Sequence, residues 1–156
     1  MEVNERPNLG PMVAALCLQQ LRLYTEDLAG RGPILGAGRM RGEAVIRERG
    51  LVGSQLEADK MHQIFLEVFG LEGTRLCLVT EVVPSADGGF DVKLVEGACT
   101  YRAQADKPMC VYTLGVFVGA VQTIMGSPMQ GFEVECQATG HPACWYQIRP
   151  HAALSF

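Results

Sequence analysis

The chain has 156 residues, which is enough for one domain with a hydrophobic core and too few for two independent domains. Its 48% hydrophobic and 19% charged residues exclude a disordered chain, and the formal net charge of −4 argues against nonspecific binding to nucleic-acid backbones. No segment approaches the roughly 18 consecutive apolar residues that a membrane span requires.

The start of the chain, MEVNERPNLG, is polar and acidic, and therefore does not resemble a secretory signal. We expect a cytoplasmic protein, in which thiols stay reduced and the six cysteines indicate metal binding or burial rather than a disulfide framework. No linker or repeat divides the sequence. We therefore expect one domain over residues 1–156, with residues 1–10 as a flexible tail.

A first helix is predicted over residues 11–29, which begin with Pro11, a residue that suits the first turn. Apolar side chains form one helical stripe at Val13, Cys17, Leu21, Tyr24 and Leu28. Met12, Leu16 and Leu23 lie off this stripe, so more than one face of the helix is apolar. Such a helix is either central or covered by a second subunit, and we expect a homodimer formed through residues 11–29.

The glycine-rich stretch GRGPILGAGR interrupts this pattern before a second helix at about residues 37–49. Its glycines resemble a nucleotide fingerprint, but the spacing differs and no strand precedes them, which argues against a dinucleotide site. A third helix is predicted after a capping box at Ser54–Glu57, and Gly70 ends it. Its apolar face consists of Met61, Ile64, Phe65 and Val68.

Alternating or continuous apolar residues after Gly73 predict β-strands. TRLCLVTEVVP and GFDVKLVEG form a hairpin joined by SADGG, and ACTYRAQA allows a further strand. Residues 110–125 return to helical length, and the pair Gly115 and Gly119 would let this helix lie close to a sheet. Two final strands are expected at about 130–138 and 143–149. This order of elements predicts an α+β fold with helices packed on an antiparallel sheet.

The stretch ECQATGHPACWYQI, near the end of the chain, contains Cys136 and Cys144 with seven residues between them. A hairpin of the last two strands would bring both thiols to one end of the sheet. Cys110 opens the preceding helix, whose N-terminus favours a thiolate. Glu133 reaches the same place only if its strand bulges, since strict alternation puts Glu133 and Cys136 on opposite faces.

Four such residues would make a closed site of three sulfurs and one oxygen, which suits Zn²⁺, with His141 as a competing fourth ligand. Buried free thiols are an alternative, because cysteine packs as a small hydrophobe. A disulfide is another. A catalytic cysteine is a third alternative, although no His/Asp partner pattern accompanies one.

The C-terminal half resembles the 4-vinyl-reductase domain, a small ligand-binding module. The resemblance rests on a helix of the form CxxxxGxxxGxxxxxxG from Cys110, on ExxC at Glu133–Cys136 and on GxxxC at Gly140–Cys144. Related domains are the sensor regions of phenol- and xylene-responsive transcription activators, and their fold is similar to subunits of the TRAPP vesicle-tethering complex. The resemblance implies a ligand-binding fold of the type found in NO-signalling and Golgi-transport proteins.

In the aromatic-sensing members of this family, a cysteine, a glutamate and two further cysteines hold a structural zinc. Their spacing matches Cys110, Glu133, Cys136 and Cys144, so the resemblance implies Zn²⁺ as a structural cofactor. The other cysteines have no place in this pattern and are expected in the core: Cys17, Cys77 and Cys99.

The resemblance also implies a mostly apolar ligand cavity between helices and sheet. Candidates for its lining are Phe65, Phe69, Tyr101, Tyr112, Phe117 and Trp145, with Met61 and Met109 as adaptable fillers. Each of them could instead be an ordinary core residue. His62 lies roughly where the phenol sensors use a histidine to hold a hydroxyl, with an offset of about one residue; a surface or core histidine is the alternative.

These observations favour a stand-alone small-molecule-binding module, a carrier or sensor of a hydrophobic, aromatic or tetrapyrrole-type ligand. One alternative is a dimeric assembly factor resembling the TRAPP subunits. Another is a protein that assists vinyl reduction in (bacterio)chlorophyll synthesis. The sequence contains no recognisable nucleotide, flavin or iron–sulfur site, so we do not expect an enzyme in its own right.

Overall fold

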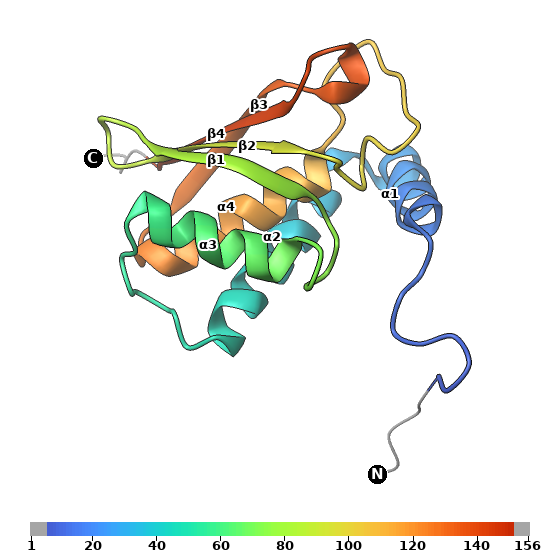
Figure 1. The fold of residues 1–156 in the computed structure, drawn as a ribbon. Coiled ribbons are helices and arrows are strands. Elements are labelled where there is room, and N and C mark those ends of the chain that lie inside the picture. The colour runs from blue at the N-terminus through green and yellow to red at the C-terminus, as the bar shows by residue number, and fades with distance from the viewer. Residues whose placement is uncertain (1–5, 152–156) are drawn as a thin grey trace.

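The computed structural model describes residues 6–151 and contains one antiparallel sheet with helices packed on one of its faces (Figure 1). In chain order the elements are α1 (Ala15–Ala29), α2 (Arg31–Glu48), α3 (Ala58–Phe69), β1 (Leu78–Pro84), β2 (Phe90–Val95), α4 (Val111–Met125), β3 (Met129–Glu135), the short 3₁₀ helix η1 (Gln137–Thr139) and β4 (Cys144–Pro150). The strand order is β1-β2-β4-β3. The predicted α+β fold is confirmed. Of the tail expected at residues 1–10, residues 1–5 lie outside the described part.

The predicted hairpin is formed by β1 and β2, and residues 85–89 connect them. In this connection Asp87 Oδ1 accepts hydrogen bonds from the Ser85 hydroxyl and the Gly89 amide. Gly88 has a φ of +86°, in the left-handed region that glycine adopts without a steric penalty. β4 pairs with β2 on one side and β3 on the other, so the last strand of the chain lies inside the sheet.

The glycine-rich stretch is part of α2, because its glycines let this helix lie directly against α4. A Cβ atom at Gly42 would overlap the carbonyl oxygen of Val116, and a Cβ atom at Gly119 would overlap that of Arg39. The expectation that Gly115 and Gly119 face a sheet is therefore wrong. They face α2, since the glycines of that helix offer the matching surface without side chains.

Gly42→Ala is expected to lower the free energy of unfolding by about 1–3 kcal/mol, because the added methyl group forces the two helix backbones apart. Gly36→Ala is the matched control, since Gly36 lies in the same helix and a Cβ atom there meets nothing within 4 Å. Alanine at position 36 should stabilise the helix by about 0.5–1 kcal/mol. Urea denaturation measures both effects. Two variants of equal stability would contradict this packing.

Local predictions are wrong at the ends of the first two helices and in two connections. α1 begins at Ala15 and α2 at Arg31. The capping box does not form: the Ser54 hydroxyl donates to a carbonyl oxygen three residues earlier, because the amides of residues 53 and 55 are bound to the end of α4. The stretch 98–105 forms turns instead of a strand, since its carbonyl groups accept hydrogen bonds from side chains of α1.

α1 has a polar buried face and an apolar exposed face, the reverse of an ordinary amphipathic helix. Its buried side chains are Gln19 and Arg22. Leu21, Tyr24 and Leu28 are 66%, 62% and 89% exposed. Figure 1 shows α1 beside the layer of α2, α3 and α4 rather than within it. Within residues 6–151, no helix combines the length and the apolar composition that crossing a membrane requires.

Candidate metal centre and ligand pocket

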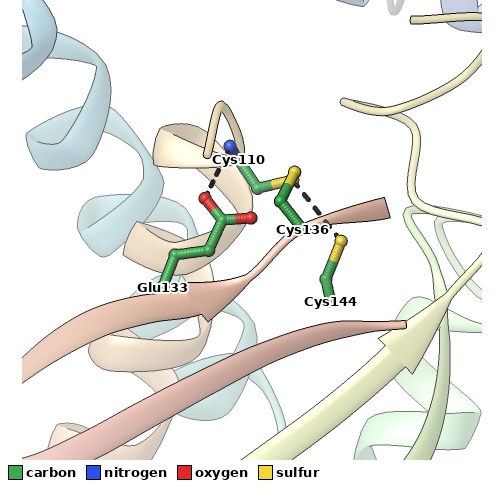
Figure 2. A group of neighbouring side chains, drawn as sticks. All are labelled: Cys110, Glu133, Cys136 and Cys144. Atoms are coloured by element: carbon green, nitrogen blue, oxygen red, sulfur yellow. Dashed lines mark hydrogen bonds between the residues drawn. The ribbon is translucent and has the colours of Figure 1, made fainter. Parts of the chain in front are cut away.

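Three buried cysteines and one half-buried glutamate converge beside the start of α4 (Figure 2). The group consists of Cys110, Glu133, Cys136 and Cys144, and one potential ligand atom of each lies within 4.8 Å of the others. The Cys110 Sγ lies 3.8 Å from the Cys136 Sγ and 3.8 Å from the Cys144 Sγ. The structure thus brings together the four residues that the sequence pattern indicates.

A bulge in β3 is what brings Glu133 to the cysteines. The register of β3 against β4 shifts between Glu133 and Glu135, which interrupts the alternation of side chains. As a result Glu133 and Cys136, three residues apart, reach the same side of the sheet. Cys110 precedes the first turn of α4, and Cys144 opens β4, so the group joins a helix to the final hairpin.

The Glu133 carboxylate has one oxygen in use and one free. Its Oε2 accepts the backbone N–H of Cys110 at 2.9 Å. Its Oε1 is buried and has no hydrogen-bond partner within residues 6–151. Burial raises the pKa of Glu133 to about 7. A buried carboxylate oxygen in this position is costly unless a proton or a cation neutralises it.

The three thiols compete for one site of negative charge. Hydrogen bonds from the thiols of Cys110 and Cys144 hold the pKa of Cys136 below that of an ordinary thiol. Donation to the Cys136 sulfur raises the pKa of Cys110. A divalent cation would replace these protons and allow all three sulfurs to bind as thiolates.

The spacing of the sulfurs fits a tetrahedral zinc site. Zinc–sulfur bonds of about 2.3 Å at tetrahedral angles place two sulfurs about 3.8 Å apart. Both measured pairs lie at this distance. A disulfide would need a separation of about 2.05 Å, and all six cysteines are free. The group could therefore hold a metal ion, with three sulfurs and the free Glu133 oxygen as donors.

His141, the alternative fourth ligand, lies outside this group. Its ring is exposed, and Nδ1 lies 3.0 Å from the Thr139 hydroxyl oxygen. Glu133→Gln is expected to weaken zinc binding by more than the roughly 10–100-fold that loss of an outer-shell partner costs, whereas His141→Ala should leave it unchanged. Competition with a chelating dye measures both affinities. The reverse ranking would make His141 the ligand.

Three of the predicted pocket residues form a closed aromatic cluster in the core. Phe65, Phe69 and Phe117 are at most 1% exposed, and their ring centroids lie 5.1–5.8 Å apart. Tyr146 adds a fourth ring, 6.0 Å from that of Phe117. The cluster therefore packs α3 and α4 against β4.

Other predicted pocket residues lie apart from this cluster and from one another. The Nε2 of His62 lies 2.9 Å from a carbonyl oxygen of β1. Tyr101 is 45% exposed, and the guanidinium of Arg102 lies over its ring. Trp145 alternates with buried neighbours in β4 and points to the opposite face of the sheet, where the Lys93 ammonium lies 5.3 Å from its ring centroid.

Phe69 and Tyr112 line a cavity of about 490 Å³ between α1 and the body of the protein, here called the α1 pocket. Its walls come from α1 and the segment before it, α2, the turn after α3, the segment after β2, and α4. Most of the lining is apolar. Several lining residues were not predicted, because segments far apart in the chain form the walls and no local pattern marks them: Leu18, Arg41, Arg75, Leu76, Ala98 and Val116.

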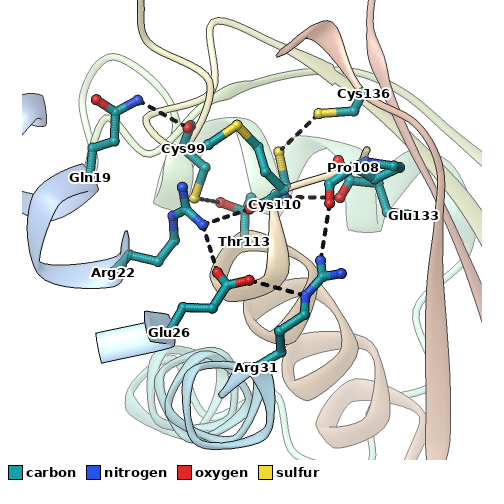
Figure 3. Close-up of polar contacts among 11 residues, drawn as sticks. Gln19, Arg22, Glu26, Arg31, Cys99, Pro108, Cys110, Thr113, Glu133 and Cys136 are labelled. Carbon is teal, nitrogen blue, oxygen red and sulfur yellow. Dashed lines mark hydrogen bonds and ion pairs between the residues drawn. The ribbon is translucent and has the colours of Figure 1, made fainter. Parts of the chain in front are cut away.

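Polar side chains of α1 bind the loop that leads to Cys110 (Figure 3). Gln19 donates to the carbonyl oxygens of Cys99 and Tyr101, at 3.3 and 2.8 Å. Arg22 donates to the carbonyl oxygen of Met109 at 2.9 Å. These bonds explain the polar buried face of α1. They could not be predicted from the sequence, since backbone acceptors carry no residue-type signature.

The chain resembles known proteins in a domain model and in fold. Residues 92–150 match the vinyl-4-reductase domain model. The phenol-responsive sensory domain of the transcription activator PoxR, solved with phenol, superposes with a TM-score of 0.68 at 20% identity, over 90% of this chain and 76% of that chain. A vinyl-4-reductase family protein from Methanocaldococcus jannaschii gives a TM-score of 0.62 at 14% identity, over 92% and 85% of the two chains.

The fold also extends to vesicle trafficking. A trafficking protein particle complex subunit 3 from Naegleria fowleri, covalently bound to palmitic acid, gives a TM-score of 0.57 at 17% identity, over 91% of this chain and 92% of that chain. No protein of curated function matches the sequence significantly. The predicted resemblance to the 4-vinyl-reductase family is confirmed: residues 92–150 match its domain model, within a fold shared with a phenol sensor and a TRAPP subunit.

Proposed function

We propose that this protein is a small-molecule-binding module, a carrier or sensor for a hydrophobic or aromatic ligand, with a structural zinc ion in the Cys₃Glu group. The observation that carries the proposal is the α1 pocket, a mostly apolar cavity of about 490 Å³. Ligand sites commonly have volumes of about 300–1,000 Å³ and are lined mainly by apolar and aromatic side chains. The phenol bound to the PoxR sensory domain supports an aromatic ligand, and the palmitic acid on the TRAPP subunit supports an apolar one.

The metal group and the pocket meet on α4. Cys110 precedes this helix, and Tyr112 and Val116, in its first two turns, line the α1 pocket. Zinc bound to Cys110 and to the final hairpin would fix this end of α4 against the sheet. In this proposal the metal takes no part in chemistry; it keeps one wall of the pocket in place.

Titration with 2-naphthol, a neutral fluorescent aromatic, tests ligand binding at this site. Thr74→Trp places a large ring at the pocket lining and is expected to weaken binding at least about tenfold, since the cavity is filled. Thr80→Trp is the matched control, because Thr80 is also exposed but lies on β1 outside the pocket lining. Equal affinity in both variants would show that the probe binds elsewhere.

We also propose that a second copy of the chain covers the exposed face of α1. Cys17, Leu21, Tyr24 and Leu28 form a stripe with alternating intervals of four and three residues, the spacing at which two helices interlock. The stripe carries no charge, so the same stripe on a two-fold-related copy meets no like charge. Its exposed leucine and tyrosine side chains are otherwise left in water.

Leu21→Glu is expected to convert the dimer to a monomer at micromolar concentration, because a two-fold interface then buries two carboxylates close together. Leu71→Glu is the control, since Leu71 is 63% exposed and lies outside α1. Sedimentation velocity distinguishes the two species. A wild-type monomer, or a dimer that survives Leu21→Glu, would contradict the interface.

A further inference from the structure

We infer that the ligand of the α1 pocket is an amphiphile with a carboxylate head group, which Arg41 and Arg75 bind while its apolar body fills the cavity. This inference rests on the proposed ligand-binding function and adds the chemical class of the ligand. It depends on the distribution of charge around the pocket, which a purely hydrophobic ligand would not explain.

The charge of the pocket lining differs from that of the whole chain. The chain has 17 acidic and 13 basic residues, excluding histidine. Yet the lining of the α1 pocket has two charged residues, Arg41 and Arg75, and no aspartate or glutamate. Both arginines are exposed, which places their charges at the rim, while Leu76, Ala98 and Phe69 are buried. The cavity therefore has an apolar interior and a positive rim.

Arg41 is not neutralised by an acidic side chain. Its guanidinium makes no hydrogen bond or ion pair within the described part of the chain. It lies close enough to Tyr112 to lower the pKa of that phenol, although burial has the larger effect and raises the pKa. By contrast Arg47, on the same helix, binds the carboxylate of Glu43 at 2.8 Å. Arg41 is thus an unpaired cation beside the polar edge of a pocket-lining ring.

Arg75 lies on the opposite side of the pocket, in the turn after α3. Its Nε donates to the carbonyl oxygen of Leu71 at 3.0 Å, which leaves the Nη groups of the guanidinium available. Its φ of +55° lies in the left-handed region, where an arginine is uncommon. Glu96 lines an adjacent hollow that also includes Arg75, but the two side chains form no ion pair.

A carboxylate suits this arrangement better than a neutral hydroxyl. A guanidinium donates two parallel hydrogen bonds to a carboxylate, and such charge-assisted bonds are roughly twice as strong as neutral ones. The hydroxyl groups of Thr74 and Tyr112 are further polar groups of the lining. An aryl or alkyl carboxylate would leave its apolar part in the cavity and its charge at the rim.

Two probes of the same shape test the inference: naphthalene-2-carboxylate and its neutral amide, naphthalene-2-carboxamide, titrated calorimetrically into the purified protein. We expect the wild type to bind the carboxylate about tenfold more tightly, because hydrogen bonds to a charged group contribute more than neutral ones. Arg41→Met and Arg75→Met should each reduce this preference, and the double variant should abolish it without changing the affinity for the carboxamide. Arg47→Met, on the same helix as Arg41 but outside the lining, should keep the preference.

The outcomes separate this inference from the proposed function. Equal binding of both probes by the wild type, or a preference that survives the double variant, overturns the carboxylate class and leaves a pocket for neutral ligands. Failure of the wild type to bind either probe contradicts the pocket itself and the inference with it. Thermal unfolding of each variant verifies that the exposed substitutions leave the fold intact.

Discussion

Cys144→Ser is expected to release one zinc ion per chain and to lower the melting temperature. The residue opens β4, and its sulfur lies 3.8 Å from that of Cys110, so its loss opens the closed donor set. A metal that binds only the folded chain stabilises it by its binding free energy. A loss of about 4 kcal/mol would lower the melting temperature of a chain of this size by about 8–16 °C.

Cys17→Ser is the matched control for this experiment. It makes the same chemical change at an exposed cysteine on α1, outside the metal group. We expect unchanged zinc content by elemental analysis and a melting temperature within about 1 °C, as for most surface substitutions. If Cys144→Ser keeps its zinc, or if neither protein contains any, the four residues do not form the site proposed here.

Phe117→Ala is expected to lower the free energy of unfolding by about 3–5 kcal/mol, the usual cost of removing a buried aromatic ring. Phe117 is 0% exposed, and its ring lies 5.1 Å from those of both Phe65 and Phe69. Its loss leaves a cavity where α3, α4 and β4 meet. Urea denaturation, with the midpoint and slope fitted together, measures the effect.

Phe132→Ala provides the comparison, because Phe132 is 52% exposed on β3 and removing its ring creates no buried cavity. Its effect should stay below about 1 kcal/mol. A small stability loss in Phe117→Ala, combined with weaker binding of 2-naphthol, would instead place Phe117 in a ligand site. The two measurements together therefore decide between the core and ligand interpretations of the aromatic cluster.

Elements with strong local patterns were predictable from the sequence. The β1–β2 hairpin follows from two apolar runs around SADGG, and α4 ends at Gly126 as its glycine predicts. The four metal-site residues were also predictable, although Glu133 violates strand alternation. A bulge resolves that violation, and a single sequence contains no pattern that fixes a bulge in advance.

Features that depend on distant contacts were not predictable in the same way. The glycines of α2 look like a break in a helix until the matching glycines of α4 lie against them. The turns of residues 98–105 depend on hydrogen bonds from Gln19, about 80 residues earlier. The α1 pocket is formed by segments spread over much of the chain, so its two arginines carry no local signature. In each case tertiary contacts override local propensity.

Native mass spectrometry of the purified protein, supported by elemental analysis, tests the proposed zinc site most directly. We predict one zinc ion per folded chain, retained under native conditions and lost on denaturation. We also predict that the Cys144→Ser protein carries none. A folded wild-type protein whose mass equals that of the chain alone would contradict the zinc site and return its cysteines to the role of buried core residues.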